Sequence, residues 1–207
     1  MKNPWEEMEL AHYEAHMSLQ GVEQLQTLET ITKEQLEAFD VTSVAILGIA
    51  GGNGLKHIPE TVASIIGVDI NREYLIACEA RYGNMNGRLS LLCKDLSQDE
   101  AALPSVDLIL ANLFVEYVGI ERFANLVSVN GAKYVSCAIQ INTKAQFVSV
   151  SPYAKMFDGI GALHQDIDPT AFSSTLQKAG YVELRQVQYN LPNGKYLLRL
   201  DYAQYDS

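Results

Sequence analysis

From residue 43 onward, short apolar runs alternate with stretches of helical periodicity, and this alternation limits the folds open to the chain. Five runs are nearly continuous in apolar residues, as expected of parallel strands covered on both faces. They are 44–47, 63–68, 89–93, 106–111 and 133–139. Helices are expected between them, at 54–59, 71–82, 114–128 and 168–179. Strands that alternate with helices predict a parallel sheet with right-handed crossovers.

The last segment departs from this alternation. Residues 181–190 and 195–203 have the pattern of two strands, and the linker between them contains Asn193-Gly194, a pair that suits a tight hairpin turn. The two strands of a hairpin are antiparallel, so a reversed strand should lie at or near one edge of the sheet. We therefore expect an α/β fold, doubly wound and Rossmann-like, with a mainly parallel seven-stranded sheet and an antiparallel C-terminal hairpin strand.

The first 41 residues have helical character throughout. A polar helix is expected over 5–18, and apolar residues recur at helical intervals over 22–39. The tetrad Thr32-Lys33-Glu34-Gln35 fits a capping box, which predicts a break in the second helix near Ile31. We therefore expect an N-terminal helical cap over 1–41 and a ligand-binding domain over 42–207.

The charge balance and the cysteines narrow the class of protein. Fifteen basic and 25 acidic residues give a net charge of −10, which argues against non-specific binding to nucleic acid or to an anionic membrane. The sequence contains no run of 18 apolar residues, and its acidic start is unlike a secretory signal. Cys78, Cys93 and Cys137 form no CxxC pair, so we expect buried free thiols in a reducing cytoplasm.

The richest motif is the glycine loop 47–54, which follows the first strand directly and has glycine at four positions. Glycine permits a tight turn and a close approach of a ligand to the backbone. The helix expected after the loop would offer free N–H groups to an anionic ligand group. Asp69 ends the second strand, 21 residues after Gly48, where an aspartate can accept two hydrogen bonds from a ribose diol. Together these features predict a ligand that contains adenosine.

Known nucleotide motifs separate the possible ligands only in part. The phosphate-loop pattern is absent, because Gly54 is followed by Leu55 and Lys56 and not by Lys-Ser or Lys-Thr. The dinucleotide pattern GxGxxG needs glycine near positions where Ala50 and Asn53 stand. An NAD(P)-dependent oxidoreductase stays open as an alternative, since Asp69 would serve that ribose as well.

At these residues the chain resembles the class I S-adenosylmethionine-dependent methyltransferases. The resemblance spans about 42–205, and the segment around Tyr13 looks like the helical cap of a small bacterial branch of unassigned substrate. It implies that 48–52 hold the methionine end of the cofactor, that Asp69 binds the ribose, and that Asp95 lies near the adenine amino group. The implied cofactor-binding residues are Gly48, Ile49, Ala50, Gly52, Asp69, Ile70, Asp95, Leu96 and Asn112.

One position departs from the family, and several of the implied residues have other readings. The family often has an acid two residues before the first glycine, where this chain has Ile46, so backbone carbonyls would have to hold the methionine amine. Asp69 and Asp95 could instead cap helices, the latter a short helix at 98–102. Asn112 could be a turn residue, and Ile70 could belong to the core.

The sequence gives fewer signals for the residues that would bind the acceptor of the methyl group. His12 and His16 share a helical face, but no third ligand is evident, so we predict no metal site. Tyr13, His16 and Asn112 are the candidates for residues that act on the acceptor. Its expected walls are the cap, the segment 112–117 and the loop 140–162. His164 is expected on a surface loop, although it could serve as a base.

The resemblance implies methyl transfer by in-line displacement, in which the cofactor supplies the electrophile and the protein aligns the acceptor. A general base is needed only if the acceptor is protonated at the working pH. The acidic chain makes a small-molecule acceptor the expectation, ahead of a protein. A non-catalytic nucleotide-binding scaffold on the same fold is a further alternative.

Overall fold

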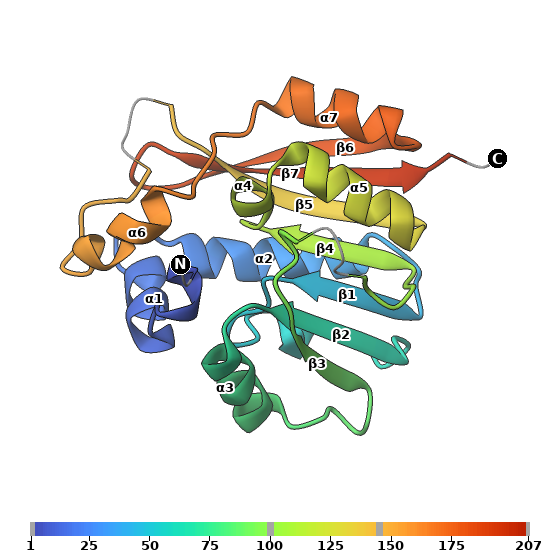
Figure 1. The fold of residues 1–207 in the computed structure, drawn as a ribbon, viewed down its shortest axis with the longest axis horizontal. Helices are drawn as coiled ribbons and strands as arrows, with labels where there is room; N and C mark the ends of the chain where they lie inside the picture. The colour runs from blue at the N-terminus through green and yellow to red at the C-terminus, as the bar shows by residue number, and fades with distance from the viewer. Residues whose placement is uncertain (1–2, 99–101, 144–146, 206–207) are drawn as a thin grey trace.

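The computed structural model describes residues 3–98, 102–143 and 147–205, and its strands form one seven-stranded sheet (Figure 1). The strands are β1 (Ser43–Leu47), β2 (Ser64–Asp69), β3 (Leu89–Cys93), β4 (Leu108–Asn112), β5 (Tyr134–Ile141), β6 (Tyr181–Asn190) and β7 (Tyr196–Gln204). Their order is β3-β2-β1-β4-β5-β7-β6, and β1 to β5 pair in parallel. The expected doubly wound Rossmann-like sheet is confirmed.

The C-terminal hairpin closes the sheet as expected. β7 pairs antiparallel with β5 on one side and with β6 on the other, so the reversed strand is second from the edge. The turn ends at Gly194, whose φ of +80° belongs to the left-handed region that glycine enters without a steric cost. The Asn-Gly signal therefore marked the turn correctly.

Helices cover both faces of the sheet (Figure 1). Alternate residues of β1 enter different cores, with Val44 and Ile46 on one face and Ala45 and Leu47 on the other. The first face packs against α2 (Gln24–Glu37) and α3 (Arg72–Tyr82). The second packs against α4 (Val115–Val118), α5 (Ile120–Asn130) and α7 (Pro169–Lys178). Two short helices, α1 (Leu10–Ser18) and α6 (Asp158–Gly161), lie beside the carboxyl ends of the parallel strands.

The single N-terminal helix expected over 5–18 is wrong in its first half. The chain forms a 3-10 turn, Pro4–Glu6, and then α1. Asn3 caps the turn, because its side chain accepts a hydrogen bond from the Trp5 N–H and Glu6 accepts one from the Asn3 N–H. The carbonyls of Trp5 and Met8, which a continuous helix would use internally, accept hydrogen bonds from Asn71.

The break expected near Ile31 is also wrong, since α2 runs without interruption through it. Thr32 does not cap a helix. Its hydroxyl accepts a hydrogen bond of 3.2 Å from Asn112 on β4, so the side chain joins α2 to the sheet. The boundary predicted between residues 41 and 42 falls in the loop between α2 and β1.

Two other expected helices change. The stretch 54–59 forms only a three-residue 3-10 turn, Leu55–His57, because Pro59 forces the preceding residue into an extended conformation. Gly119, with φ of +83°, divides the expected helix 114–128 into α4 and α5. The helix expected at 98–102 lies largely outside the described residues. Cys93 is exposed, contrary to expectation, whereas Cys78 and Cys137 are buried free thiols.

Among the helices that the structure describes, none combines the length and the apolar character that a membrane crossing would require.

Candidate functional site

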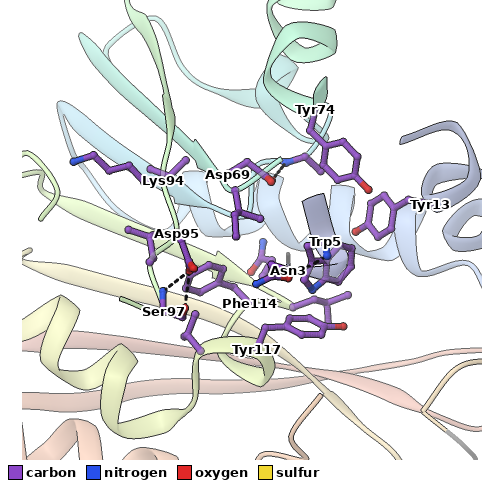
Figure 2. Close-up of a pocket in the computed structure, with 18 residues that line it drawn as sticks. Asn3, Trp5, Tyr13, Asp69, Tyr74, Lys94, Asp95, Ser97, Phe114 and Tyr117 are labelled. Carbon is purple, nitrogen blue, oxygen red and sulfur yellow. Dashed lines mark hydrogen bonds between the residues drawn. The ribbon is translucent and has the colours of Figure 1, made fainter. Parts of the chain in front are cut away.

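A cavity of about 710 Å³, including its open mouth, lies where β1, β2 and β4 end (Figure 2). The crevice at the carboxyl ends of the strands is where open α/β sheets bind ligands. Its floor includes Gly48 and Ala50 from the glycine loop and Asp69 from β2. We call it the first cavity.

Asp69 joins the two strands that form the floor of the first cavity. Its Oδ2 accepts a hydrogen bond of 2.9 Å from the Ala50 N–H, and its Oδ1 accepts one of 2.9 Å from the Asn71 N–H. Burial raises the pKa of this carboxyl, and hydrogen bonds from the backbone N–H groups of Asn71, Ala50 and Ile70 oppose that rise. The bond also holds Ala50 in the left-handed region, at φ of +48°. Ala50 therefore has a backbone conformation that is usual for glycine.

The other side of the first cavity is aromatic (Figure 2). Trp5 packs edge-on against Tyr13 and Tyr117, at centroid distances of 5.8 and 5.0 Å. The Tyr13 ring stacks on Tyr74 at 6.2 Å. Burial raises the pKa of Tyr13 and of Tyr74, so both hydroxyls stay protonated and can donate. Tyr74 of α3 also lines the cavity.

One of these hydroxyls is left without a partner. Tyr74 Oη is buried and makes no hydrogen bond within the part of the chain that the structure describes, although a buried polar group without one costs about 1–3 kcal/mol. Because the ring lines the first cavity, a ligand with an acceptor atom would satisfy it.

The N-terminal segment is anchored over the first cavity by Asn71, which follows β2. Its Nδ2 donates to the carbonyls of Trp5 and Met8, at 2.8 and 3.1 Å. Its Oδ1 accepts from the N–H of Glu73 and of Tyr74, which caps α3. A single buried side chain therefore fixes both the cap segment and the helix that carries Tyr74.

The structure places most of the predicted cofactor residues at this cavity. Besides Gly48, Ala50 and Asp69, the predicted residues that line it are Ile70, Asp95, Leu96 and Asn112. Burial would raise the pKa of the Asp95 carboxyl, but hydrogen bonds from Ser97 and Gln98 hold it below its usual value. Lys94, which the sequence reading did not single out, lies beside them (Figure 2).

Two predicted residues are not brought to the first cavity. The side chain of Ile49 is buried in the core against Gly67. Gly52 lies under α3, where an added Cβ would stand 2.9 Å from Cys78 Sγ. Gly51, next to it, is covered by an ion pair that the sequence reading missed: Glu14 of α1 and Arg81 of α3 meet at 2.8 Å between Oε2 and Nη2.

Asn112 holds the cap to the tip of β4. Its Oδ1 accepts a hydrogen bond from Gln35 Nε2, and its Nδ2 donates to Gln35 Oε1 and to Thr32 Oγ1. Gln35 is fully buried near the end of α2, and the amide of Asn112 satisfies its polar side chain. The amide of Asn112 is thus engaged by the cap, while the residue also lines the first cavity.

A second cavity of about 470 Å³ adjoins the first, and Trp5, Tyr13, Leu113 and Tyr117 line both. The cap, residues of 113–117 and residues of 140–164 form its wall. His16 lines this cavity and not the first, with Nδ1 at 2.7 Å from Ser151 Oγ. Burial lowers the pKa of His16, and Lys195 lowers it further.

Among the described residues, no group of three or more His, Cys, Asp and Glu side chains forms a metal site. His12 pairs with Glu9 on its own helix, at 3.3 Å.

No protein-family model matches the chain, and no curated protein matches it. Solved structures do. The N-methyltransferase NodS from Bradyrhizobium japonicum WM9, in complex with S-adenosylhomocysteine, is 12% identical, with a TM-score of 0.64 over 99% of this chain and 100% of that chain. Magnesium protoporphyrin IX methyltransferase from Synechocystis PCC 6803, with the same ligand, is 13% identical, with a TM-score of 0.62 over 87% and 83%. The chain has the class I S-adenosylmethionine-dependent methyltransferase fold.

The methyltransferase fold hosts other chemistry too, since the cyclase SpnF is 9% identical, with a TM-score of 0.64 over 87% of this chain and 82% of that chain. The residues of this chain must therefore decide the function. In the methyltransferase fold of this chain, the first cavity offers a carboxylate at the tip of β2, apolar walls and the unpartnered Tyr74 hydroxyl. These donor and acceptor groups fit a nucleoside linked to an amino acid.

Proposed function

We propose that the protein is an S-adenosylmethionine-dependent methyltransferase that acts on a small molecule. The observation that carries this proposal is the first cavity itself, in which Asp69, at the end of β2, faces an aromatic wall from the cap. Asp69 would accept hydrogen bonds from the ribose hydroxyls, and Ile70 and Leu96 would enclose the adenine. Asp95 would accept a hydrogen bond from the adenine amino group.

The local structure after the glycine loop favours this cofactor over a dinucleotide. A dinucleotide needs a helix N-terminus for its pyrophosphate. Between Gly54 and β2, where every residue is described, the chain forms only the 3-10 turn Leu55–His57. The sheet also differs from the dinucleotide-binding order 3-2-1-4-5-6, because β7 inserts antiparallel between β5 and β6. A sulfonium nucleoside carries no phosphate and does not need the missing helix.

The main task of the protein in this reaction would be to align the acceptor with the cofactor. S-adenosylmethionine supplies the electrophilic methyl group when it is bound. The backbone of Gly48 and Ala50 would hold its amino-acid end, and Tyr74 Oη would donate a hydrogen bond to it. Trp5 and Tyr13 would exclude water from the boundary between the two cavities. Such orientation can contribute about 7–11 kcal/mol to catalysis. The closed aromatic surroundings favour a small acceptor over a protein chain.

Ligand-induced stabilisation tests the proposal. S-adenosylhomocysteine at about 100 times its dissociation constant should add about 2.7 kcal/mol, which raises the melting temperature by roughly 5–10 °C. Asp69→Ala should lose most of this shift. NADH is the control ligand and should give none. A shift with NADH and none with S-adenosylhomocysteine would favour the oxidoreductase and contradict the proposal. Binding without turnover on any acceptor would favour a scaffold.

A further inference from the structure

The second cavity holds two buried polar atoms that find no hydrogen-bond partner among the described residues, Glu116 Oε2 and His164 Nε2. Glu116 is 1% exposed, and its other oxygen accepts a hydrogen bond of 2.8 Å from the Gln140 N–H. Nothing in the proposed cofactor site uses either side chain. A buried carboxylate oxygen without a donor is costly, so the pair points to a ligand that donates hydrogen bonds.

His164, expected on a surface loop, is part of this wall. Its ring stacks on Phe147 at a centroid distance of 3.7 Å and meets Tyr117 edge-on at 6.0 Å. Burial lowers the pKa of His164, an effect that Asp166 opposes and Lys195 reinforces. The imidazole is therefore neutral at pH 7, and Nε2 is an acceptor when the proton lies on Nδ1.

The other side chains that line the second cavity favour a ligand that combines a positive charge with an aromatic ring. Trp5, Tyr13, Tyr117, Phe147 and Phe157 contribute aromatic rings to the second cavity. Aromatic faces attract an ammonium group, and they stack on aromatic ligands. A neutral alcohol would gain the hydrogen bond to a carboxylate but not the attraction of opposite charges.

We propose that the second cavity binds the methyl acceptor, a small primary amine that carries an aromatic ring, and that Glu116 receives its proton. This inference rests on the proposed function, because the methyl group must come from the first cavity. Trp5 and Tyr13 line both cavities, so the two ligands would meet between these side chains.

The reaction balances without a further reactant. The ammonium of the bound amine gives one proton to Glu116 Oε2 and becomes a neutral nucleophile. Its nitrogen lone pair then forms a bond to the methyl carbon, while the carbon–sulfur bond of the sulfonium breaks and leaves its electron pair on sulfur. The products are a methylated ammonium and a neutral thioether. His164 Nε2 would accept a second hydrogen bond from the nitrogen and orient it.

The experiment uses the full chain saturated with S-adenosylhomocysteine, and titrates it with three amines and their matched alcohols. The probes are benzylamine, phenethylamine and tryptamine, against benzyl alcohol, 2-phenylethanol and tryptophol. We expect at least one amine to bind at least tenfold more tightly than its alcohol. Glu116→Gln, which keeps the shape and the Gln140 contact, should remove this preference. It should also lower turnover with S-adenosylmethionine by about 10²-fold or more, as for a lost general base.

The matched control is Glu121→Gln on the exposed face of α5, which should bind amines like the wild type. If no amine binds better than its alcohol, or if Glu116→Gln keeps the preference, the inference is wrong. The wild-type comparison of amine with alcohol stands even if the variant fails to fold. Failure of S-adenosylhomocysteine to bind the wild type would instead refute the proposed function, so the two failures are distinguishable.

Discussion

Asp69 Oδ2 accepts a hydrogen bond of 2.9 Å from the Ala50 N–H, so one side chain ties the tip of β2 to the glycine loop after β1. The same carboxylate lines the first cavity. Asp69, which the sequence predicts to bind the ribose, therefore also fixes the conformation of the loop next to the predicted ligand. Because Asp69 has both roles, a substitution there should change folding stability as well as ligand binding, and the two effects can be measured separately.

Asp69→Asn should destabilise the protein even without ligand. An amide offers one oxygen acceptor where the carboxylate offers two, so the N–H of Ala50 or of Asn71 would lose its partner. The expected loss is about 1–3 kcal/mol in the free energy of unfolding, measured with urea. Asp95→Asn is the control, because the donors of this exposed turn, which are groups of Ser97 and Gln98, can still reach water. Equal stability of wild type and Asp69→Asn would contradict the structural half of the role.

Neighbouring glycines in the loop should respond differently to alanine. A Cβ at Gly52 would stand 2.9 Å from the buried Cys78 Sγ, and φ there is +88°, so Gly52→Ala should cost about 2–4 kcal/mol. At Gly51 the Cβ would meet the ends of the side chains of Arg81, Glu14 and Leu10, which can move aside. Urea unfolding should show Gly51→Ala losing less than about 1 kcal/mol. A reversed order of the two variants would show that the loop is built differently.

The stability of the protein should depend on pH through the titration of Glu116. Burial, with a smaller contribution from Asp166, raises the pKa of this carboxyl to about 7, although hydrogen bonds from the N–H groups of Gln140 and of Glu116 itself lower it. The other titratable groups that face it are His164, Tyr117 and Cys137. The folded state holds the proton more tightly than the unfolded state, so this stabilisation is full below pH 4.5 and is lost as the pH rises through 7.

Glu116→Gln removes this titration. As the pH rises from 5 to 8, the free energy of unfolding of the variant should therefore increase relative to that of the wild type, by an amount on the order of 3 kcal/mol. Urea unfolding of both proteins at the two pH values measures it. Because most other groups titrate alike in both, they cancel in the difference. Curves that run parallel with pH would indicate that Glu116 has an ordinary pKa.

The ion pair inside the sheet should matter far more than the one on the surface. Arg199 and Asp201 of β7 are 0% and 2% exposed, and Nη2 lies 2.7 Å from Oδ2. Asp201→Asn removes the charge of the carboxylate that lies 2.7 Å from the buried guanidinium, and should cost about 3–5 kcal/mol although Glu34 stays at 3.5 Å. Glu14→Gln breaks the partly exposed pair with Arg81 and should cost about 1 kcal/mol or less. Similar losses in urea unfolding would contradict this ranking.

Local patterns in the sequence were enough to predict the sheet. Buried parallel strands are continuous apolar runs, and Asn193-Gly194 suits its turn whatever surrounds it. The same reasoning failed where tertiary contacts outweighed local preference. Thr32 and Gln35 have the sequence of a cap, yet they bind Asn112 from within an unbroken helix. The expected helix after Gly54 was limited to a short turn by Pro59.

The sequence by itself determined the order of the strands along the chain, the glycine loop and the acid at the end of β2, because each depends on neighbours within a few residues or on one strand–helix–strand unit. Only the tertiary structure brought Glu116 beside His164 and Trp5 beside Tyr13 and Tyr117. These residues come from the cap, from α4 and from the loop after β5, and no periodicity links such distant segments. Their approach depends on packing against the finished sheet, which is why the acceptor side emerges only from the folded chain.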